Sequence, residues 1–290
     1  MEKGVQRWMV DISKWDPSPL DFSSALSVLP QPDHPSITRF IKMDDRKRAL
    51  VSRLLQYALV HEILGIPYDG IVIRRTMEGK PYLDCHTDEL QFPNFNFNVS
   101  HQGDFVLIAS EPLCLIGVDV ISCDKPQNET IPQFLRNFTP YFSSFEWENI
   151  RKSDSFEENL TDFYRYWCLK EAYVKATGGG LAHGLDKIEF HHTDWSDIFV
   201  KVDGEPMMEW RFWLSELPKN HWVSIARGHP KHAAESFKRV LNWKDFEETE
   251  YLKCLSLPNS QFTERKVEQL ISVLHCTQRC TDQTLIRSSR

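Results

Sequence analysis

The chain has 290 residues, of which 41% are hydrophobic and 26% charged, and its net charge is −7. This composition is typical of a globular protein with one large or two medium-sized domains. The negative charge argues against a general nucleic-acid binder, and no apolar run approaches the roughly 18–20 residues of a membrane span. The seven cysteines include no CxxC pair, and the N-terminus does not resemble a secretory signal. We therefore expect reduced thiols, no zinc site and a cytoplasmic (cytosolic) protein.

The first strong element is a long helix. Residues 8–12 alternate weakly and predict an edge strand, and a loop rich in proline follows them. Residues 44–64 then place apolar side chains at helical spacing. Asp44 or Asp45 would cap the start of this helix, and Gly65 would end it.

A basic segment surrounds this helix. Residues 39–80 contain nine Lys or Arg and five Asp or Glu, so the segment carries +4 within an acidic protein. Residues 71–73 predict a strand, and Gly79 marks a turn after it. Such a gathering of arginines and lysines suits a small molecule rich in phosphate, although a solvated face would have the same composition.

Three strands are predicted next. Residues 95–100 alternate between apolar and polar side chains, and residues 105–109 return after a turn. Residues 115–121 form an apolar run with one acid, Asp119, inside it. A carboxylate within such a strand is unfavourable unless it is paired or bound to a metal ion.

A second long helix is predicted from about residue 160 to residue 177, ended by three glycines. One face of it carries Trp167, Lys170, Glu171, Val174 and Lys175. A carboxylate and two ammonium groups on one face suit a site that holds a metal ion together with a phosphate. The alternative is a solvated i,i+4 pair between Glu171 and Lys175, which would contribute only a few tenths of a kcal/mol.

The pattern of a long helix followed by short strands occurs twice. After the second helix, four segments predict antiparallel strands: residues 187–190, 197–202, 210–214 and 222–226. No close sequence repeat accompanies this pattern, so the duplication is architectural.

Two stretches together resemble the motifs of a known family. Gly117-Val118-Asp119 and the run WCLKEAYVK from Trp167 to Lys175 are similar to the G-[VI]-D and W-x-x-K-E-[AS]-x-x-K motifs of the 4'-phosphopantetheinyl transferases, in particular of the Sfp-like class and its animal members. The motifs occur here in the family's order. Either one alone would be weak support, and the ordered pair is specific.

The resemblance implies an α+β fold of two similar halves. Each half would be a small antiparallel sheet with a long helix, in a pseudo-two-fold arrangement with the active site in the cleft between them. The corresponding division is an N-terminal half of residues 1–112, a C-terminal half of residues 113–228, and an extension of residues 229–290. We expect the extension to be partly disordered or helical and to contribute no chemistry.

The resemblance also implies a reaction. Phosphopantetheine would move from coenzyme A to a serine of an apo acyl carrier protein or carrier domain, of the fatty acid synthase or aminoadipate reductase type. Adenosine 3',5'-bisphosphate would be released, and Mg²⁺ would be required. Asp119 and Glu171 would bind the metal ion, Lys175 would complete the catalytic set, and Glu171 is the leading candidate for the general base.

Coenzyme A would contact two further segments. His101 would contact the 3'-phosphate. The segments that match the family are Arg75, Thr76, Met77, Glu78, Gly79 and Lys80, and then Asn98, Val99, Ser100 and His101. Two departures accompany this match. Ile121 occupies a position where bacterial members have a third acid. Ser36 aligns with an early arginine that some relatives use to bind the nucleotide phosphate. Arg39, Arg46 or Lys47 would make this contact here.

Three alternatives remain. The chain could be a catalytically inactive coenzyme A sensor of the same fold, an unrelated magnesium phosphohydrolase, or a scaffold that acts through the tail after Gly228. The presence of Asp119, Glu171 and Lys175 disfavours the sensor, and the absence of a GxxxxGK[ST] motif disfavours a P-loop enzyme. Transfer should survive deletion of the tail. We expect a monomer that binds neither nucleic acid nor a membrane.

Overall fold

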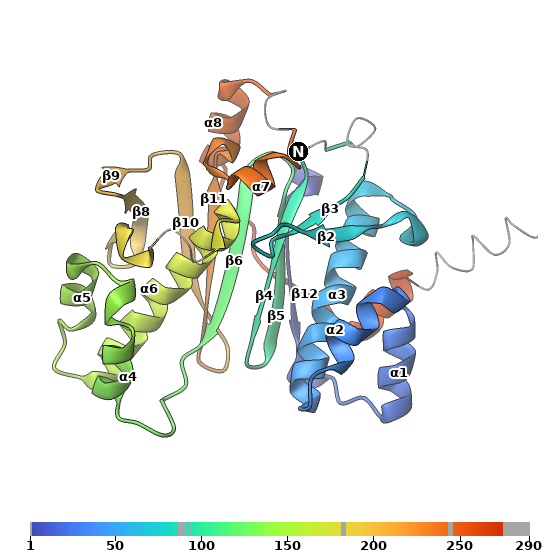
Figure 1. Cartoon of the computed structure of the whole chain (residues 1–290), viewed down its shortest axis with the longest axis horizontal. Coiled ribbons are helices and arrows are strands. Elements are labelled where there is room, and N and C mark those ends of the chain that lie inside the picture. Colours follow the sequence, from blue (N-terminus) through green and yellow to red (C-terminus); the bar gives the residue numbers. More distant parts are fainter. Residues whose placement is uncertain (1, 86–90, 93, 181–183, 243–245, 275–290) are drawn as a thin grey trace, which may run out of the picture.

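The computed structural model describes residues 2–85, 91–92, 94–180, 184–242 and 246–274. No helix among these residues has both the length and the apolar character that crossing a membrane requires. Two groups of strands stand side by side in the middle of the molecule, and a long helix covers each group from the outside (Figure 1).

The first half runs from β1 to β5. Its elements are β1 (Gln6–Asp11), α1 (Pro19–Ser27), α2 (His34–Thr38), α3 (Met43–Leu64), β2 (Ile73–Arg75), β3 (Pro81–Leu83), β4 (Asn96–Gln102) and β5 (Phe105–Glu111). Strand β5 pairs antiparallel with both β1 and β4. Helix α3 packs against this sheet because its apolar side chains, Leu54 among them, share one core with Val106 and Ile108 of β5.

The second half runs from β6 to β11. Its elements are β6 (Leu115–Ser122), α4 (Ile131–Asn137), α5 (Ser144–Ile150), α6 (Phe156–Thr177), β7 (Ile188–Thr193), β8 (Ser196–Val202), β9 (Glu205–Pro206), β10 (Trp210–Leu217) and β11 (His221–Gly228). Strand β11 pairs antiparallel with both β10 and β6. Helix α6 lies across this sheet.

The two halves repeat one architecture. Each begins with a strand, continues with a helix of 22 residues and a small antiparallel ladder, and ends with two paired strands. The strand orders β1-β5-β4 and β6-β11-β10 correspond position by position. The predicted α+β fold of two similar halves is therefore confirmed, as is the predicted antiparallel pairing of the last strands.

Polar side chains join the halves at the edge strands β4 and β6. The side-chain oxygens of Asn96, Asn98 and Ser100 accept hydrogen bonds from backbone N–H groups of β6, at residues 116, 118 and 120, over 3.0–3.3 Å. All three polar side chains are buried. They take the place of a backbone ladder and so fix the register of one half against the other.

The segment after β11 returns to the first half. It contains α7 (Glu235–Lys238), α8 (Glu248–Ser256), β12 (Thr263–Glu264) and a helix over residues 267–274. Strand β12 pairs in parallel with β1, and Val267, Leu270 and Leu274 are buried in the core of the first half. Strand β1 therefore lies between β12 and β5, and its prediction as an edge strand is wrong.

The ends of the two long helices match the prediction at their C-termini but not at their N-termini. Gly65 and Gly178 end α3 and α6 in the left-handed conformation, with φ of 70° and 74°, as predicted. However, the N-cap of α3 is Lys42, without a side-chain hydrogen bond, so neither Asp44 nor Asp45 caps it. These two carboxylates lie in the first turn, where their negative charges interact favourably with the positive end of the helix dipole. Helix α6 begins four residues earlier than predicted, because Ser155 caps it.

Candidate active site

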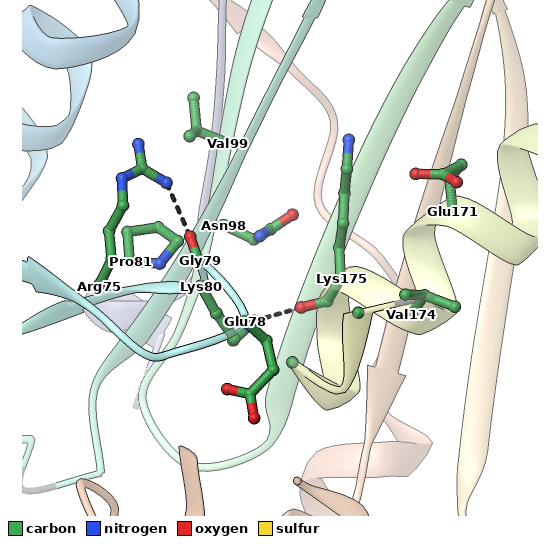
Figure 2. Close-up of a pocket in the computed structure, with 12 residues that line it drawn as sticks. Arg75, Glu78, Gly79, Lys80, Pro81, Asn98, Val99, Glu171, Val174 and Lys175 are labelled. Carbon is green, nitrogen blue, oxygen red and sulfur yellow. Dashed lines mark hydrogen bonds between the residues drawn. The ribbon is translucent and has the colours of Figure 1, made fainter. Parts of the chain in front are cut away.

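A cavity of about 270 Å³ lies between the halves, and we name it the central cavity. It is lined by Arg75, Glu78, Gly79, Lys80, Pro81, Asn98 and Val99 from the first half and by Glu171, Val174, Lys175, Gly178 and Gly180 from the second. In Figure 2, Arg75 and Lys175 flank Asn98 and Val99 from opposite sides, and Glu171 lies one helical turn before Lys175.

Asp119 of β6 lies beside this cavity, and of the two states that the sequence allowed, paired or bound to a metal ion, it shows the pairing. Its side chain is only 8% exposed. One carboxylate oxygen, Oδ1, accepts hydrogen bonds from Lys175 Nζ at 2.5 Å and from Ser100 Oγ at 2.8 Å. Burying a carboxylate costs several kcal/mol unless such partners offset the loss of water. Ser100 and Lys175 therefore hold the Asp119 carboxylate in one orientation.

Glu171 is the second carboxylate and has no hydrogen-bond partner among the described residues. Burial raises its pKa above 4.5, the Asp119 charge raises it further, and Lys175 opposes both. Burial lowers the pKa of Lys175, but the charge and hydrogen bond of Asp119 outweigh it, so the net pKa is raised. The three groups thus interact electrostatically, with one carboxylate held and the other free.

The donor set fits a magnesium ion. Mg²⁺ prefers oxygen ligands and is commonly held by one or two carboxylates, with water and substrate phosphate supplying the remaining ligands. Asp119 and Glu171 provide two carboxylates, and the described residues contain no cluster of three or more side chains suited to a metal ion. Ile121, where the resemblance led us to look for a third acid, is 5% exposed and packs in the core of the second half.

Helix α6 and strand β6 approach each other closely because position 117 is glycine. A Cβ on Gly117 would lie 1.9 Å from the Ala172 carbonyl oxygen and 2.6 Å from the Ala176 nitrogen. Only a residue without a side chain permits this contact. It brings the strand that carries Asp119 against the helix that carries Glu171.

The predicted polar face of α6 is only partly correct. Lys170 points into the second half, where its ammonium pairs with Glu146 at 2.7 Å and donates to the Leu185 carbonyl at 2.8 Å. Both charged side chains of this pair are fully buried. Trp167 packs edge to face with Phe138 in an aromatic cluster. Of the five predicted residues, Glu171, Val174 and Lys175 line the cavity.

The β2–β3 hairpin brings the predicted coenzyme A segment to the cavity, but its side chains differ in direction. The Arg75 guanidinium donates to the Gly79 carbonyl at 2.8 Å and stays at the cavity surface. Met77 is 97% exposed and, like Thr76, does not line the cavity. Glu78 accepts a hydrogen bond from the Ser236 hydroxyl at 2.5 Å.

Lys80, predicted to contact coenzyme A, lines the central cavity while its ammonium is bound to backbone oxygens. Its ammonium donates to the carbonyls of Ile116 at 3.0 Å and Lys175 at 2.6 Å, and its side chain is buried. Burial and the neighbouring Lys175 charge lower the pKa of Lys80 to about 7. The side chain thus contributes its stem to the cavity wall and directs its charged end at backbone oxygens.

A second cavity of about 620 Å³, which we name the outer cavity, shares Arg75 with the central cavity as a lining residue. His101 and Arg39 line it together with Ser36, whereas Arg46 and Lys47 do not. Burial lowers the pKa of His101, and the charges of Lys175 and Arg48 lower it further. The sequence therefore identified some residues of each cavity, without indicating that His101 and Lys175 belong to different ones.

One ion pair of the outer cavity was missed. Arg53 of α3 is 9% exposed and binds both carboxylate oxygens of Asp33 at 2.6 Å, and the Tyr57 hydroxyl donates to the same carboxylate at 3.0 Å. This pair fixes the loop before α2 against α3. The sequence placed Arg53 only in the basic segment of residues 39–80, and nothing in it indicated Asp33 as the partner.

Comparison with known proteins agrees with the two motifs. Residues 13–113 match the family described as 4'-phosphopantetheinyl transferase, N-terminal, and residues 115–226 match the 4'-phosphopantetheinyl transferase superfamily. The L-aminoadipate-semialdehyde dehydrogenase-phosphopantetheinyl transferase of Rattus norvegicus is 36% identical over 232 residues, covering 77% of this chain and 75% of its own.

Two further relatives cover more of the chain. The Xenopus laevis enzyme of the same name is 34% identical, over 83% of this chain and 85% of its own. A phosphopantetheinyl transferase of Thraustochytrium is 32% identical, over 80% of each chain. The chain therefore belongs to the 4'-phosphopantetheinyl transferase family, as its two motifs predicted.

Proposed function

We propose that this protein transfers 4'-phosphopantetheine from coenzyme A to a serine of an apo acyl carrier protein or carrier domain, with Mg²⁺, and releases adenosine 3',5'-bisphosphate. One observation supports this most strongly. Asp119 lies on β6 and Glu171 on α6, and these two elements are in close contact at Gly117. Lys175 and Arg75 both line the central cavity, and Lys175 pairs with Asp119. Two carboxylates with two cations match the needs of phosphoryl transfer.

The cations would neutralise the phosphates. In the reaction, the serine oxygen forms a bond to the phosphorus that bears the pantetheine arm, and the bond from that phosphorus to the bridging oxygen breaks. Charge develops on the leaving phosphate, and Lys175 and Arg75 line the cavity in which it would lie. Asp119 and Glu171 would hold Mg²⁺, which would supply further positive charge to the phosphate oxygens.

Glu171 is the residue proposed to accept the serine proton, directly or through a water molecule. Its carboxylate has no hydrogen-bond partner among the described residues, and its raised pKa brings it nearer to the working pH. Asp119 is a poorer candidate, because Ser100 and Lys175 already donate to it.

The outer cavity is the proposed place for the nucleotide end of coenzyme A. Arg39 and His101 line it, and Arg75 lines both this cavity and the central cavity. The partner would be an acidic carrier of the fatty acid synthase or aminoadipate reductase type, received by basic surface near these cavities. We propose that the protein acts as a cytosolic monomer.

The test is the intact mass of an apo carrier protein after incubation with this protein, coenzyme A and Mg²⁺. We expect a gain of one phosphopantetheine that disappears with chelator or with Asp119→Asn. Glu157→Gln is the matched control, because Glu157 also pairs with a lysine, at 3.0 Å, but on an exposed surface. Coenzyme A binding without any mass gain on several carriers would instead support the inactive sensor.

A further inference from the structure

The side chain of Lys80 crosses from the first half to the second. It leaves the hairpin at β3, is 5% exposed, and ends on two carbonyl oxygens of the second half, those of Ile116 and Lys175. The Phe237 ring covers the ammonium at 4.7 Å. Among the described residues, the contacts of this ammonium are therefore backbone oxygens and a ring face, and none is a carboxylate.

The Lys175 carbonyl needs an external donor. Helix α6 ends at Thr177, so the last carbonyls of the helix have no N–H group one turn ahead. The Gly179 N–H, which would be next in line, donates to the Thr177 hydroxyl instead. Lys80 supplies the missing donor, and a cation at the negative end of a helix is favourable.

The Ile116 carbonyl belongs to β6, three residues before Asp119. One ammonium thus binds both elements that carry the proposed metal ligands: α6 with Glu171 and β6 with Asp119. The stem of Lys80 is also fixed, because its Cδ lies 2.9 Å from the position that a Cβ on Gly178 would occupy. The spacing between helix and strand depends on this contact as well as on Gly117.

We propose that Lys80 is a positioning residue, which sets Glu171 against Asp119 from the other half of the molecule, and that it does not bind coenzyme A phosphate directly. Arg75 of the same hairpin differs, because its guanidinium donates only to Gly79 among the described residues and lines both cavities. Arg75 would bind phosphate. This inference rests on the proposed function, since it assigns Lys80 a role in the same reaction.

Kinetics and binding distinguish the two roles when Lys80→Met is compared with Arg75→Met. For Lys80→Met, we expect kcat to fall about tenfold or more and the half-saturating Mg²⁺ concentration to rise, with the Kd for coenzyme A from calorimetry changed less than about threefold. For Arg75→Met, we expect the Kd to rise about tenfold. A Lys80→Met variant with the Kd loss of Arg75→Met and an unchanged kcat would overturn the inference.

A second measurement uses the unaltered protein and so does not depend on how the variant folds. The protein is treated with a water-soluble acetylating reagent, with and without coenzyme A, and the modified lysines are identified by peptide mass spectrometry. We expect Lys80 to resist modification in both samples. Lys175, whose side chain is 29% exposed, should react and be protected by coenzyme A. A Lys80 that reacts freely and is protected by coenzyme A would refute the inference.

The two hypotheses fail separately. If the unaltered protein bound coenzyme A but transferred nothing, the proposed function would fail, while acetylation and calorimetry would still report on Lys80. If transfer occurred and Lys80→Met matched the unaltered protein in kcat and in Mg²⁺ dependence, only the positioning role would be refuted.

Discussion

The Glu171 carboxylate is held in a place that costs folding free energy. Burial and the Asp119 charge raise its pKa above 4.5, so the folded protein binds this proton more tightly than the unfolded chain does. The penalty is absent well below pH 4.5, builds up between pH 4.5 and the raised pKa of the folded state, and is complete above that pKa. A side chain that destabilises the folded protein at neutral pH does not serve stability, which is consistent with a role of Glu171 in the reaction.

Glu171→Gln should therefore raise the melting temperature of the metal-free protein at about pH 7.5 and lose transfer activity. The gain in stability should shrink as the pH falls and vanish well below pH 4.5. Thermal denaturation across this pH range checks it, with Glu157→Gln as an exposed control. A Gln variant that melts below the unaltered protein at neutral pH would contradict the explanation.

Ser100 acts on the other carboxylate. Its hydroxyl donates to Asp119 and accepts hydrogen bonds from the Val120 N–H and from Lys175. Ser100→Ala should cost about 1–3 kcal/mol, because a buried N–H loses its partner, and should also raise the Mg²⁺ requirement and slow transfer.

Ser110→Ala is the control for this change. Ser110 is also buried and lies on β5, and its hydroxyl donates to the Gly4 carbonyl. We expect it to lower stability without altering the Mg²⁺ dependence. Equal effects of the two variants on transfer would mean that Ser100 does not orient Asp119.

Residue types indicated which side chains gather here but not what each one contacts. Asp119 was expected to be paired or bound to a metal ion, because an acid in an apolar strand has few alternatives, and it is paired with Lys175. Lys170 and Lys80 could not be assigned in the same way. A lysine ends several bonds from its backbone, so its partner depends on tertiary structure, and here both lysines end on buried oxygens.

At the scale of elements, the contact between β6 and α6 is the feature on which the site depends. Gly117→Ala would place a Cβ 1.9 Å from the Ala172 oxygen, so helix and strand must separate. We expect a loss of about 1–3 kcal/mol or more and loss of transfer, since Asp119 and Glu171 would move apart. Chemical denaturation and the carrier mass assay together measure this.

Gly79→Ala provides the comparison in stability. Gly79 has φ of 94° but no atom within 4 Å of its added Cβ, so only backbone strain of about 1–2 kcal/mol is expected. If Gly117→Ala were no more destabilising than Gly79→Ala, the close approach of β6 and α6 would not be the reason for glycine in this motif.

Periodicity predicted the long elements well and the short ones poorly. Helices α3 and α6 span 22 residues each, enough for an apolar stripe and a glycine end signal to be recognised. Strands β9 and β12 have two residues each and carry no pattern. Because β12 went unrecognised, β1 was taken for an edge strand.

The whole molecule is held together by buried polar contacts between parts distant in sequence. Glu111 of the first half pairs with Arg7 and with Arg227 of the second half, and all three side chains are almost fully buried. Arg227 also donates to the carbonyl of Leu257, and Arg7 to the side chain of Asn259. The segment after β11 therefore supplies acceptors to a charge network that links both halves.

This network predicts that the C-terminal segment is needed for folding, contrary to the expectation from sequence. Deletion after Gly228 would remove Val267, Leu270 and Leu274 from the first core, at about 1.5–3 kcal/mol for each buried side chain. It would also leave Arg7 and Arg227 short of acceptors. Such losses approach the whole stability of a typical protein, about 5–15 kcal/mol.

We therefore expect a chain ending at Gly228 to be insoluble or to lack a cooperative thermal transition, and to transfer nothing. A chain ending at Leu274 should melt like the unaltered protein and retain transfer. Circular dichroism, thermal denaturation and the carrier mass assay on both truncations distinguish the cases. A chain ending at Gly228 with an unchanged melting temperature and full transfer would show that the C-terminal segment is dispensable. The pairing of β12 with β1 and the burial of the helix over residues 267–274 argue against that result.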